Sequence, residues 1–439
     1  MQVCNRHKSL LHEMFTLTKF AIKKMNRIIV SAIAFLATAA MHAQEISYGA
    51  YMERVLSGNI ALAARKMDIE IADAGVKKSK VYNDPTIALT YTNSEDWDKK
   101  LGQGIELELS RSFTFGVRRN RIDLAENERK QSVALFEEYM RNFRADATIA
   151  YLEHLRAKMI LDEAKEIYKE LSSVADNDSI RFRRGDIAES DWLESRMAQG
   201  MAKNSMLDAE TQLTNSAIKM GYFMGSISGA ESLRGTGTLE MSEKALPLDS
   251  YIEKALAHRA DIVVALGRAD IASATQKFNK ALRRPDLNVT VGATYNRARP
   301  DFTTLKAGIA VPLKFSNLNK GARIIDELLV KQANIEIEEA RLLVQADVTQ
   351  AYNEFGSALK QSTTFSSDML SDMRSVVAGK KRAYELGEIS FHDYLIVERN
   401  ESEMRREHIE TLFNKAVAWV ELQRATGFSM EFGTMPITE

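Results

Sequence analysis

The chain has 439 residues, a formal net charge of −1 and a single cysteine, Cys4. The near balance of basic and acidic residues leaves no cationic excess of the kind that binds nucleic acid. One cysteine also excludes a disulfide framework within the chain. The fold therefore has to be held without covalent cross-links.

The N-terminal segment has the pattern of a secretory signal that begins at Met25. A short basic start is followed by an apolar run over residues 28–40 and then by small residues. This pattern predicts cleavage after Ala43, with either Met1 or Met25 as the true start. Residues 1–43 carry six basic residues and one acidic residue, a net charge of +5, so their removal takes the chain from −1 to about −6. We therefore expect an exported chain with a mildly acidic surface.

Proline placement leaves room for very long helices. None of the six prolines falls between Pro85 and Pro247 or between Pro312 and Pro436, and residues 117–184 contain neither proline nor glycine. Because proline interrupts helices, a helix over that range would reach about 100 Å at 1.5 Å per residue. Apolar residues recur there with heptad spacing, which predicts coiled-coil-like packing, although an ordinary helical bundle explains the same stripe. The stripe is Phe136, Met140, Phe143, Ala147 and Ala150, and Ile409, Phe413, Ala416 and Val420 repeat its spacing near the C-terminus.

The two halves of the chain resemble each other at an offset of about 200 residues. Four separate places keep this register, which indicates a tandem duplication of one supersecondary unit. The matches are Pro85 with Pro285, Ala145–Tyr151 with Ala346–Tyr352, Gly185–Asp191 with Gly387–Asp393, and Gly225 with Gly427.

Each copy opens with two segments of about ten residues in which apolar and polar side chains alternate. This alternation is typical of membrane strands, with one face toward lipid and the other toward water, but half-buried strands of a soluble sheet look similar. The predicted organisation, in chain order, is a signal sequence with an upstream extension (1–43), a first repeat (44–225), an equatorial linker (226–250), a second repeat (251–427) and a C-terminal tail (428–439). Each repeat contains a helix, two strands and a long helical hairpin, with strands expected at about 85–93, 103–115, 286–296 and 303–314.

Four strands cannot close a barrel, and an open sheet edge in lipid leaves backbone groups without partners. Two copies would supply eight strands, whose interior is filled by side chains, whereas three copies supply twelve. The predicted fold is therefore an α+β membrane protein. Each tandem-repeat subunit gives four strands of a shared 12-stranded β-barrel, plus a long α-helical, coiled-coil-like barrel.

At this point the sequence resembles the TolC-type outer membrane efflux channel family, the outer membrane factors of bacterial tripartite pumps. The resemblance covers essentially the whole exported chain. It rests on the tandem repeat, the strand pairs before long helices, the Gly-x5-Asp element in both halves and the Ala-Val-Pro-Leu stretch at 310–313. It implies a homotrimer in the outer membrane that extends into the periplasm and contacts outer-membrane lipid.

The resemblance also implies a gate at the periplasmic end. The first aperture aspartate of the family falls on Asp393, and Ile396 stands where a second acidic residue is known, so Ile396 is expected to narrow the tip. The gate-linking tyrosine matches Tyr384, its partner aspartate matches Asp191, and the arginine of that gate falls on Ile389. His392 and Glu398 are possible additions to the aperture.

These site predictions have ordinary structural alternatives. An aspartate near a helix start often caps the helix or matches its dipole, and His392 is also expected to face solvent. The basic hairpin tips, with Arg183 and Arg184 beside Gly185 and the equivalent Gly387, are candidate contacts for a periplasmic adaptor. Basic residues near a helix C-terminus are equally ordinary dipole partners.

The resemblance implies an exit duct that passively conducts what a periplasmic adaptor (membrane fusion) protein and an inner-membrane pump deliver. The preferred pump is of the resistance-nodulation-division type. Two alternatives stay open: the channel of a type I protein secretion system, and a soluble periplasmic coiled-coil structural protein. We find no catalytic or metal-ligand spacing among the histidines, so no enzyme activity, cofactor, metal site or nucleic-acid partner is expected.

Overall fold

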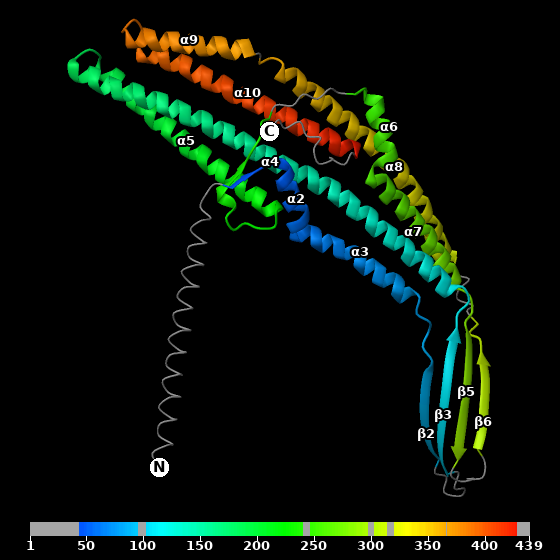
Figure 1. Cartoon of the computed structure of the whole chain (residues 1–439). Coiled ribbons are helices and arrows are strands. Elements are labelled where there is room, and N and C mark those ends of the chain that lie inside the picture. Colours follow the sequence, from blue (N-terminus) through cyan, green and yellow to red (C-terminus); the bar gives the residue numbers. More distant parts are fainter. Residues whose placement is uncertain are drawn as a thin grey trace, which may run out of the picture.

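The computed structural model describes residues 44–94, 102–239, 246–296, 303–313, 320–365 and 367–427 (Figure 1). The expected signal sequence and C-terminal tail lie outside these residues. The chain forms a long curved body of helices with a narrow sheet projecting from one end (Figure 1). Within the described part, no helix combines the length and the apolar character needed to cross a membrane.

The projecting sheet has four antiparallel strands in the order β2-β3-β5-β6, so the strand pairs of the two halves meet at its centre. Its outer strands, β2 and β6, each have one edge to which no strand of the described chain pairs. The strand bounds are Thr86–Ser94 for β2, Gly102–Phe113 for β3, Leu287–Asn296 for β5 and Thr303–Ala310 for β6.

One face of this sheet is apolar and open to its surroundings. The register aligns Leu89 with Leu107, Leu107 with Ala293 and Ala293 with Leu305, so a continuous apolar row crosses all four strands. Leu305 is 82% exposed and Leu89 is 71% exposed. The opposite face carries polar pairs such as Glu106 and Lys306, whose Oε1 and Nζ lie 2.6 Å apart. Such an apolar surface is stable only against another apolar phase or partner.

The helices form two equivalent sets. In the first half α2 and α3 precede the strand pair and α4 and α5 follow it; in the second half α6 and α7 precede the strands and α8, α9 and α10 follow. The bounds are Tyr48–Gly58 (α2), Ile60–Ser79 (α3), Val117–Arg184 (α4), Glu189–Phe223 (α5), Leu248–His258 (α6), Ala260–Leu282 (α7), Lys320–Ser362 (α8), Ser367–Glu385 (α9) and Phe391–Thr426 (α10). The 68-residue α4 confirms the single helix predicted for residues 117–184.

The second half departs from the first in one element. A single long helix was expected before its hairpin turn, but α8 ends at Ser362 and α9 begins at Ser367. The interruption follows from a run of hydroxyl residues that bond back to the preceding turn: Ser362 Oγ donates to the Leu359 carbonyl (2.9 Å) and Thr363 Oγ1 donates to the Lys360 carbonyl (2.7 Å). Serine and threonine compete in this way with helix hydrogen bonds.

A junction midway along the helices joins the two halves. The expected equatorial linker supplies the short helix η2 (Ala230–Ser232) and strand β4 (Leu233–Gly235), which pairs in parallel with β1 (Gln44–Ile46). The Tyr151 hydroxyl of α4 donates to the carbonyls of Ile46 (3.0 Å) and Thr236 (2.6 Å). This buried tyrosine therefore fixes the linker to the middle of the longest helix.

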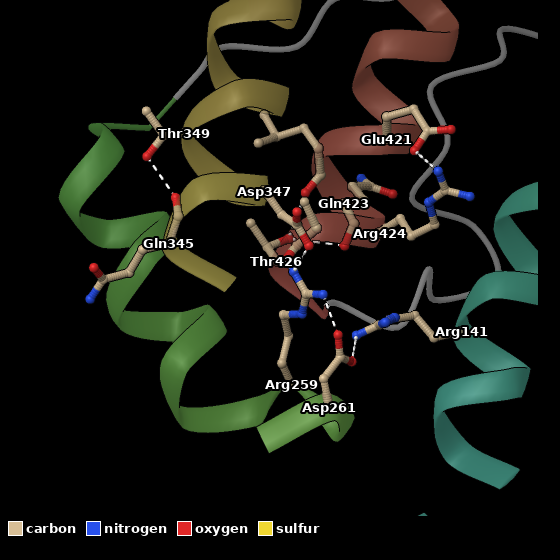
Figure 2. A network of polar contacts seen from close by, with 12 residues as sticks. Arg141, Arg259, Asp261, Gln345, Asp347, Thr349, Glu421, Gln423, Arg424 and Thr426 are labelled. Carbon is tan, nitrogen blue, oxygen red and sulfur yellow. Dashed lines mark hydrogen bonds and ion pairs between the residues drawn. The ribbon is translucent and has the colours of Figure 1, made fainter. Parts of the chain in front are cut away.

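A polar network holds the corresponding junction of the second half (Figure 2). Arg259, 5% exposed at the start of α7, donates to Asp347 on α8 (3.0 Å) and to the carbonyl of Ala425 on α10 (3.2 Å). It also pairs with Asp261, which Arg141 of α4 contacts at 2.8 Å. Burial alone would raise the pKa of Asp261, but the two arginines hold that pKa below its usual value. Four helices thus meet at one charge-compensated point.

The first half has a simpler version of the same junction. Asn59, at the position equivalent to Arg259, caps α3 by accepting from the Leu62 amide (3.0 Å) and donates to the carbonyl of Phe223 at the end of α5 (2.8 Å). Gly225 then turns the chain with φ +77°, and a Cβ there would lie 2.2 Å from the Gly58 carbonyl oxygen. Only glycine fits both the backbone angle and the close approach.

We expect Gly225→Ala to destabilise the protein by about 2–4 kcal/mol, because the side chain costs roughly 1–2 kcal/mol at this angle and also overpacks the junction. The melting temperature of the helical circular dichroism signal measures the effect. Gly200→Ala is the matched control, since nothing lies within 4 Å of a Cβ there. Gly200→Ala should be neutral or stabilising by about 0.5–1 kcal/mol. Equal melting temperatures for the two variants would contradict this account of the junction.

Candidate functional site: the hairpin tips

The two helical hairpins turn at the same end of the molecule, remote from the sheet (Figure 1). Both turns have the same hydrogen bonds. After α4 the Asp186 amide donates to Arg181 and the Gly185 amide donates to Phe182; after α9 the equivalent amides of Glu388 and Gly387 donate to Ala383 and Tyr384, all at 2.9 Å. This is the Schellman arrangement, which needs a left-handed residue, and the two glycines have φ values of +80° and +76°.

Asp393 caps the first turn of α10. Its amide donates to Ser390 Oγ (3.1 Å), and its carboxylate accepts from Ser390 Oγ (2.8 Å) and from the Ser390 amide (3.4 Å), which completes a capping box. These hydrogen bonds lower the pKa of Asp393. The carboxylate is exposed, so it is ionised at neutral pH and faces the surroundings at the tip. The single subunit therefore already shows Asp393 in a capping role. A role of Asp393 in an aperture stays a proposal.

Tyr384 does not lie at the surface of the tip. It is 3% exposed and packs in an aromatic group with Phe391 (centroids 5.6 Å apart) and Tyr394 (6.0 Å apart, nearly parallel). Leu171 and Val174 of α4 belong to the same apolar cluster. The hairpin of α9 and α10 is thereby attached to the hairpin of α4 and α5.

Asp178 of α4 is the acidic side chain that meets Tyr384. Burial raises the pKa of Asp178, while the nearby hydroxyls of Tyr384 and Ser195 and the charge of Arg181 act against that rise. Its side chain is 1% exposed, and Arg181 Nη1 lies 3.6 Å from its Oδ1. The Arg181 guanidinium also lies over the Tyr384 ring, 5.1 Å from its centroid. Tyrosine, aspartate and arginine thus connect the two hairpins one to two turns below the tips.

Asp178 and Arg181 were not predicted, because the motif match led to Asp191, which lies 13 residues after Asp178 in the chain. Asp191, the predicted partner of Tyr384, is the third residue of α5, where an acidic group favours the helix dipole. Its negative charge raises the pKa of both Asp178 and Tyr384, so it acts on the same cluster from a greater distance. The signal available in the sequence was an aspartate about one helical turn before Arg181, Arg183 and Arg184.

The remaining candidates separate into exposed and buried residues. Ile396 is 46% exposed, His392 is exposed, and Ile389 packs against the aromatic cluster. Glu398 is 3% exposed, so the structure places it inside the subunit and not on an aperture surface. Its expected contribution to an aperture is therefore not compatible with its position in this subunit.

The first tip offers an exposed basic surface. Arg183, Arg184 and Gly185 are all exposed, as is Gly387 on the second tip. Below them Phe182 stacks on Trp192 with ring centroids 4.8 Å apart, which joins α4 to α5. Among the residues that the structure describes, no group of three or more histidine, cysteine or acidic side chains could hold a metal ion.

Comparison with known proteins identifies the architecture. Residues 251–428 match the family model of the outer membrane efflux protein. This region of the chain is therefore similar to the outer membrane efflux protein family. No curated protein matches the chain.

Solved structures extend the likeness to both halves. The outer-membrane channel OprN is similar over 86% of this chain and 89% of its own, with 16% identity and a TM-score of 0.72. VceC of Vibrio cholerae (13% identity, TM-score 0.71, 87% of this chain and 96% of that one) and CmeC of Campylobacter jejuni (14%, 0.70, 86% and 84%) have the same fold. The predicted fold class is confirmed.

We expect Tyr384→Phe to loosen the tip by about 1–3 kcal/mol, because it removes the hydroxyl that faces the buried Asp178 carboxylate. Amide hydrogen exchange over residues 380–394 measures the change. Tyr394→Phe is the matched control: the glutamates near its hydroxyl act on it only through their charge, whereas Asp178 lies within reach of the Tyr384 hydroxyl, so loss of the Tyr394 hydroxyl should be neutral or stabilising. Faster exchange in both variants, or in neither, would contradict the assigned contact.

Proposed function

We propose that the protein is the outer-membrane exit duct of a tripartite efflux system and passively conducts substrates from the periplasm to the exterior. The observation that carries this proposal is the open sheet with a continuous apolar face, attached to a helical body with α4 alone about 100 Å long. The sheet suits a lipid environment, and the helices suit a water-filled compartment. OprN and CmeC, which share this fold, are described as outer-membrane channels.

The working form is a homotrimer. The edges of β2 and β6 present backbone groups that need partners in lipid, and three copies of a four-stranded sheet supply twelve strands. In such a barrel β6 of one copy pairs with β2 of the next, and outer-membrane lipid surrounds the apolar face. The exposed apolar side chains of α3 and α8, including Ile71, Ile324 and Ile335, are surfaces that neighbouring copies would cover.

The hairpin tips are the proposed contact for a periplasmic adaptor (membrane fusion) protein. Arg183, Arg184, Gly185 and Gly387 are exposed there, on the end of the body opposite the sheet. An inner-membrane pump, in first choice of the resistance-nodulation-division type, would deliver the substrate through that adaptor. Asp393, repeated three times around the axis, would form the acidic ring of the closed tip, with Ile396 beside it. Tyr384 and Asp191 would help to hold the tip closed.

The same duct can serve a type I protein secretion system, which is the second candidate function. Nothing in the tube itself distinguishes a protein from a small molecule as cargo. A soluble periplasmic coiled-coil protein is a poorer explanation, because it would leave the side chains of Leu89, Ile309 and Leu305 in water without cover.

The proposed function predicts that protein purified from the outer-membrane fraction conducts ions in planar bilayers and is blocked by multivalent cations from the tip side. Asp393→Asn should raise the blocking concentration by about tenfold or more, since three carboxylates around an axis attract cations together. Conductance traces with a trivalent cation measure this.

Ser390→Ala separates the charge of Asp393 from its capping role. It removes the hydroxyl that completes the capping box but keeps the carboxylate. Cation block should therefore persist in Ser390→Ala, whereas hydrogen exchange at the start of α10 should quicken. Absence of conductance in the wild type would overturn the proposed function, and unchanged block in Asp393→Asn would reject the acidic ring alone.

A further inference from the structure

The helices α4 and α10 pack together along a seam that joins the hairpin of α4 and α5 to the hairpin of α9 and α10. Near the tips the seam is apolar, with Leu171 and Val174 of α4 packed in one cluster with Phe391 and Tyr394 of α10. Near the junction it is apolar again. The cluster there includes Leu152 and Leu155 of α4 and Leu412, Ala416 and Val420 of α10.

Between these clusters the seam is acidic. On α4 the sequence places glutamates at 163, 166 and 170, and on α10 it places Glu398 and Glu401 followed by Arg405. Both sets have the spacing i, i+3, i+7, which keeps their members on one helix face. The helices run in opposite directions, so Glu398 is influenced by Glu170, and Glu163 by Arg405 and Glu401. Glu166 and Glu170 are exposed, whereas Glu163, Glu398 and Glu401 are buried between the two apolar clusters.

Two of these carboxylates are buried without compensation. Glu163 is 6% exposed and Glu398 is 3% exposed. Both carboxylate oxygens of Glu163 and Oε2 of Glu398 are inaccessible and have no hydrogen-bond partner in the described chain. Because these atoms are already sealed inside one subunit, a second copy or an adaptor cannot supply the missing partner without moving the helices.

Among the neighbouring cations, Arg405 is engaged by other carboxylates. Arg405 donates to Glu401 from Nε (2.8 Å) and to Glu166 from Nη1 (3.1 Å). The other charged or titratable groups that face Glu163 are Asp162, Glu166 and Glu401 with Arg374, Arg405, Arg406 and His408. Those that face Glu398 are Glu170, Glu401 and Glu403 with Lys381, Arg399, Arg405 and Arg406.

The surroundings of Glu163 are also partly apolar. It borders a cavity of about 230 Å³ between α4, α9 and α10. Leu370, Met373, Met404 and Ile409 line that cavity together with the charged groups. No arrangement suited to a metal ion is present among the described residues. A proton is therefore the neutralising group that the site can take without rearrangement.

We propose that Glu163 and Glu398 each bind a proton within the closed seam, that α10 is held against α4 while both are protonated, and that the seam weakens when they ionise. The unpartnered ionised carboxylates would draw water into the seam, and separation of the helices would hydrate them. Because α10 begins at the tip with Asp393 nearby, a weaker seam frees the hairpin of α9 and α10 from α4. That consequence for conduction rests on the proposed function, but proton binding at the seam does not.

The direction of the pH effect follows from the pKa values. Burial is the main cause that raises the pKa of Glu163 and of Glu398 to about 7 from a usual 4.5; nearby cations, Arg406 and Arg405 at Glu163 above all, act against the rise, and neighbouring glutamates add to it. A raised pKa stabilises the closed seam at low pH, and this stabilisation is lost as the pH rises through about 4.5 to 7. Within that window each glutamate makes the opening constant rise by up to about tenfold per pH unit.

The test is amide hydrogen exchange of residues 394–412 in the full-length protein in detergent micelles, between pH 5 and pH 8.5, corrected for the intrinsic pH dependence of exchange. In the wild type, opening should increase with pH and level off above about pH 7. The double variant Glu163→Gln, Glu398→Gln imitates the protonated pair and should show a flat profile. Each single variant should show a reduced slope.

Glu407→Gln is the matched control, because Glu407 is an exposed carboxylate on the same helix and its removal should leave the wild-type profile unchanged. A double variant with the wild-type slope would overturn the proposal, as would a wild-type profile that does not depend on pH. Failure of the double variant to fold would also overturn it, since the neutral pair is the state proposed to be stable. Conductance recorded on the same preparations separates proton binding at the seam from the proposed function. A protein that conducts no ions but has a pH-dependent seam contradicts only the proposed function.

Discussion

The two open edges of the four-stranded sheet are the constraint on which the rest of the molecule depends. Each edge strand presents backbone donors and acceptors that must be paired wherever water is absent. The apolar row from Leu89 to Leu305 is exposed in the single subunit and requires a nonaqueous neighbour. A sheet of this kind is complete only in an assembly, so the subunit is best understood as one sector of a closed tube.

In the proposed assembly the helices extend that sector into a long duct. Each strand pair connects directly to long helices, and the equatorial junction ties the helices of both halves together through Asn59 and Arg259. The two residues differ in chemistry but reach the equivalent carbonyls, at Phe223 and Ala425. The two halves therefore make the same helix-to-carbonyl contact at the junction, although the residue that makes it differs. Beyond this junction the hairpins are held mainly by the α4–α10 seam, where apolar clusters flank the buried acidic pair.

Much of the architecture could be predicted because its causes are local or periodic. Absence of proline and glycine gave the bounds of α4, and alternation along the strands indicated which side chains share a face. The heptad positions Phe143, Ala147 and Ala416 are buried, as their spacing predicted.

The break between α8 and α9 was missed because neighbouring hydroxyls override a proline-free stretch. At the tip, the matched motif led to Asp191, but the contact with Tyr384 depends on how two distant helices align and involves Asp178. Burial of Glu163 and Glu398 could not be read from one helix, since a glutamate at a seam position looks identical to a solvated one until its partner helix is placed.

Disulfide cross-linking between neighbouring copies tests the central claim most directly. One cysteine on β2 and one on β6, scanned along both strands in a chain that has Cys4 replaced by serine, would report on pairing of the two sheet edges under native membrane conditions. The account predicts a ladder of one, two and three linked subunits that ends at a closed trimer. No cross-link at any register, or a ladder that closes at another number, would contradict the shared twelve-stranded barrel.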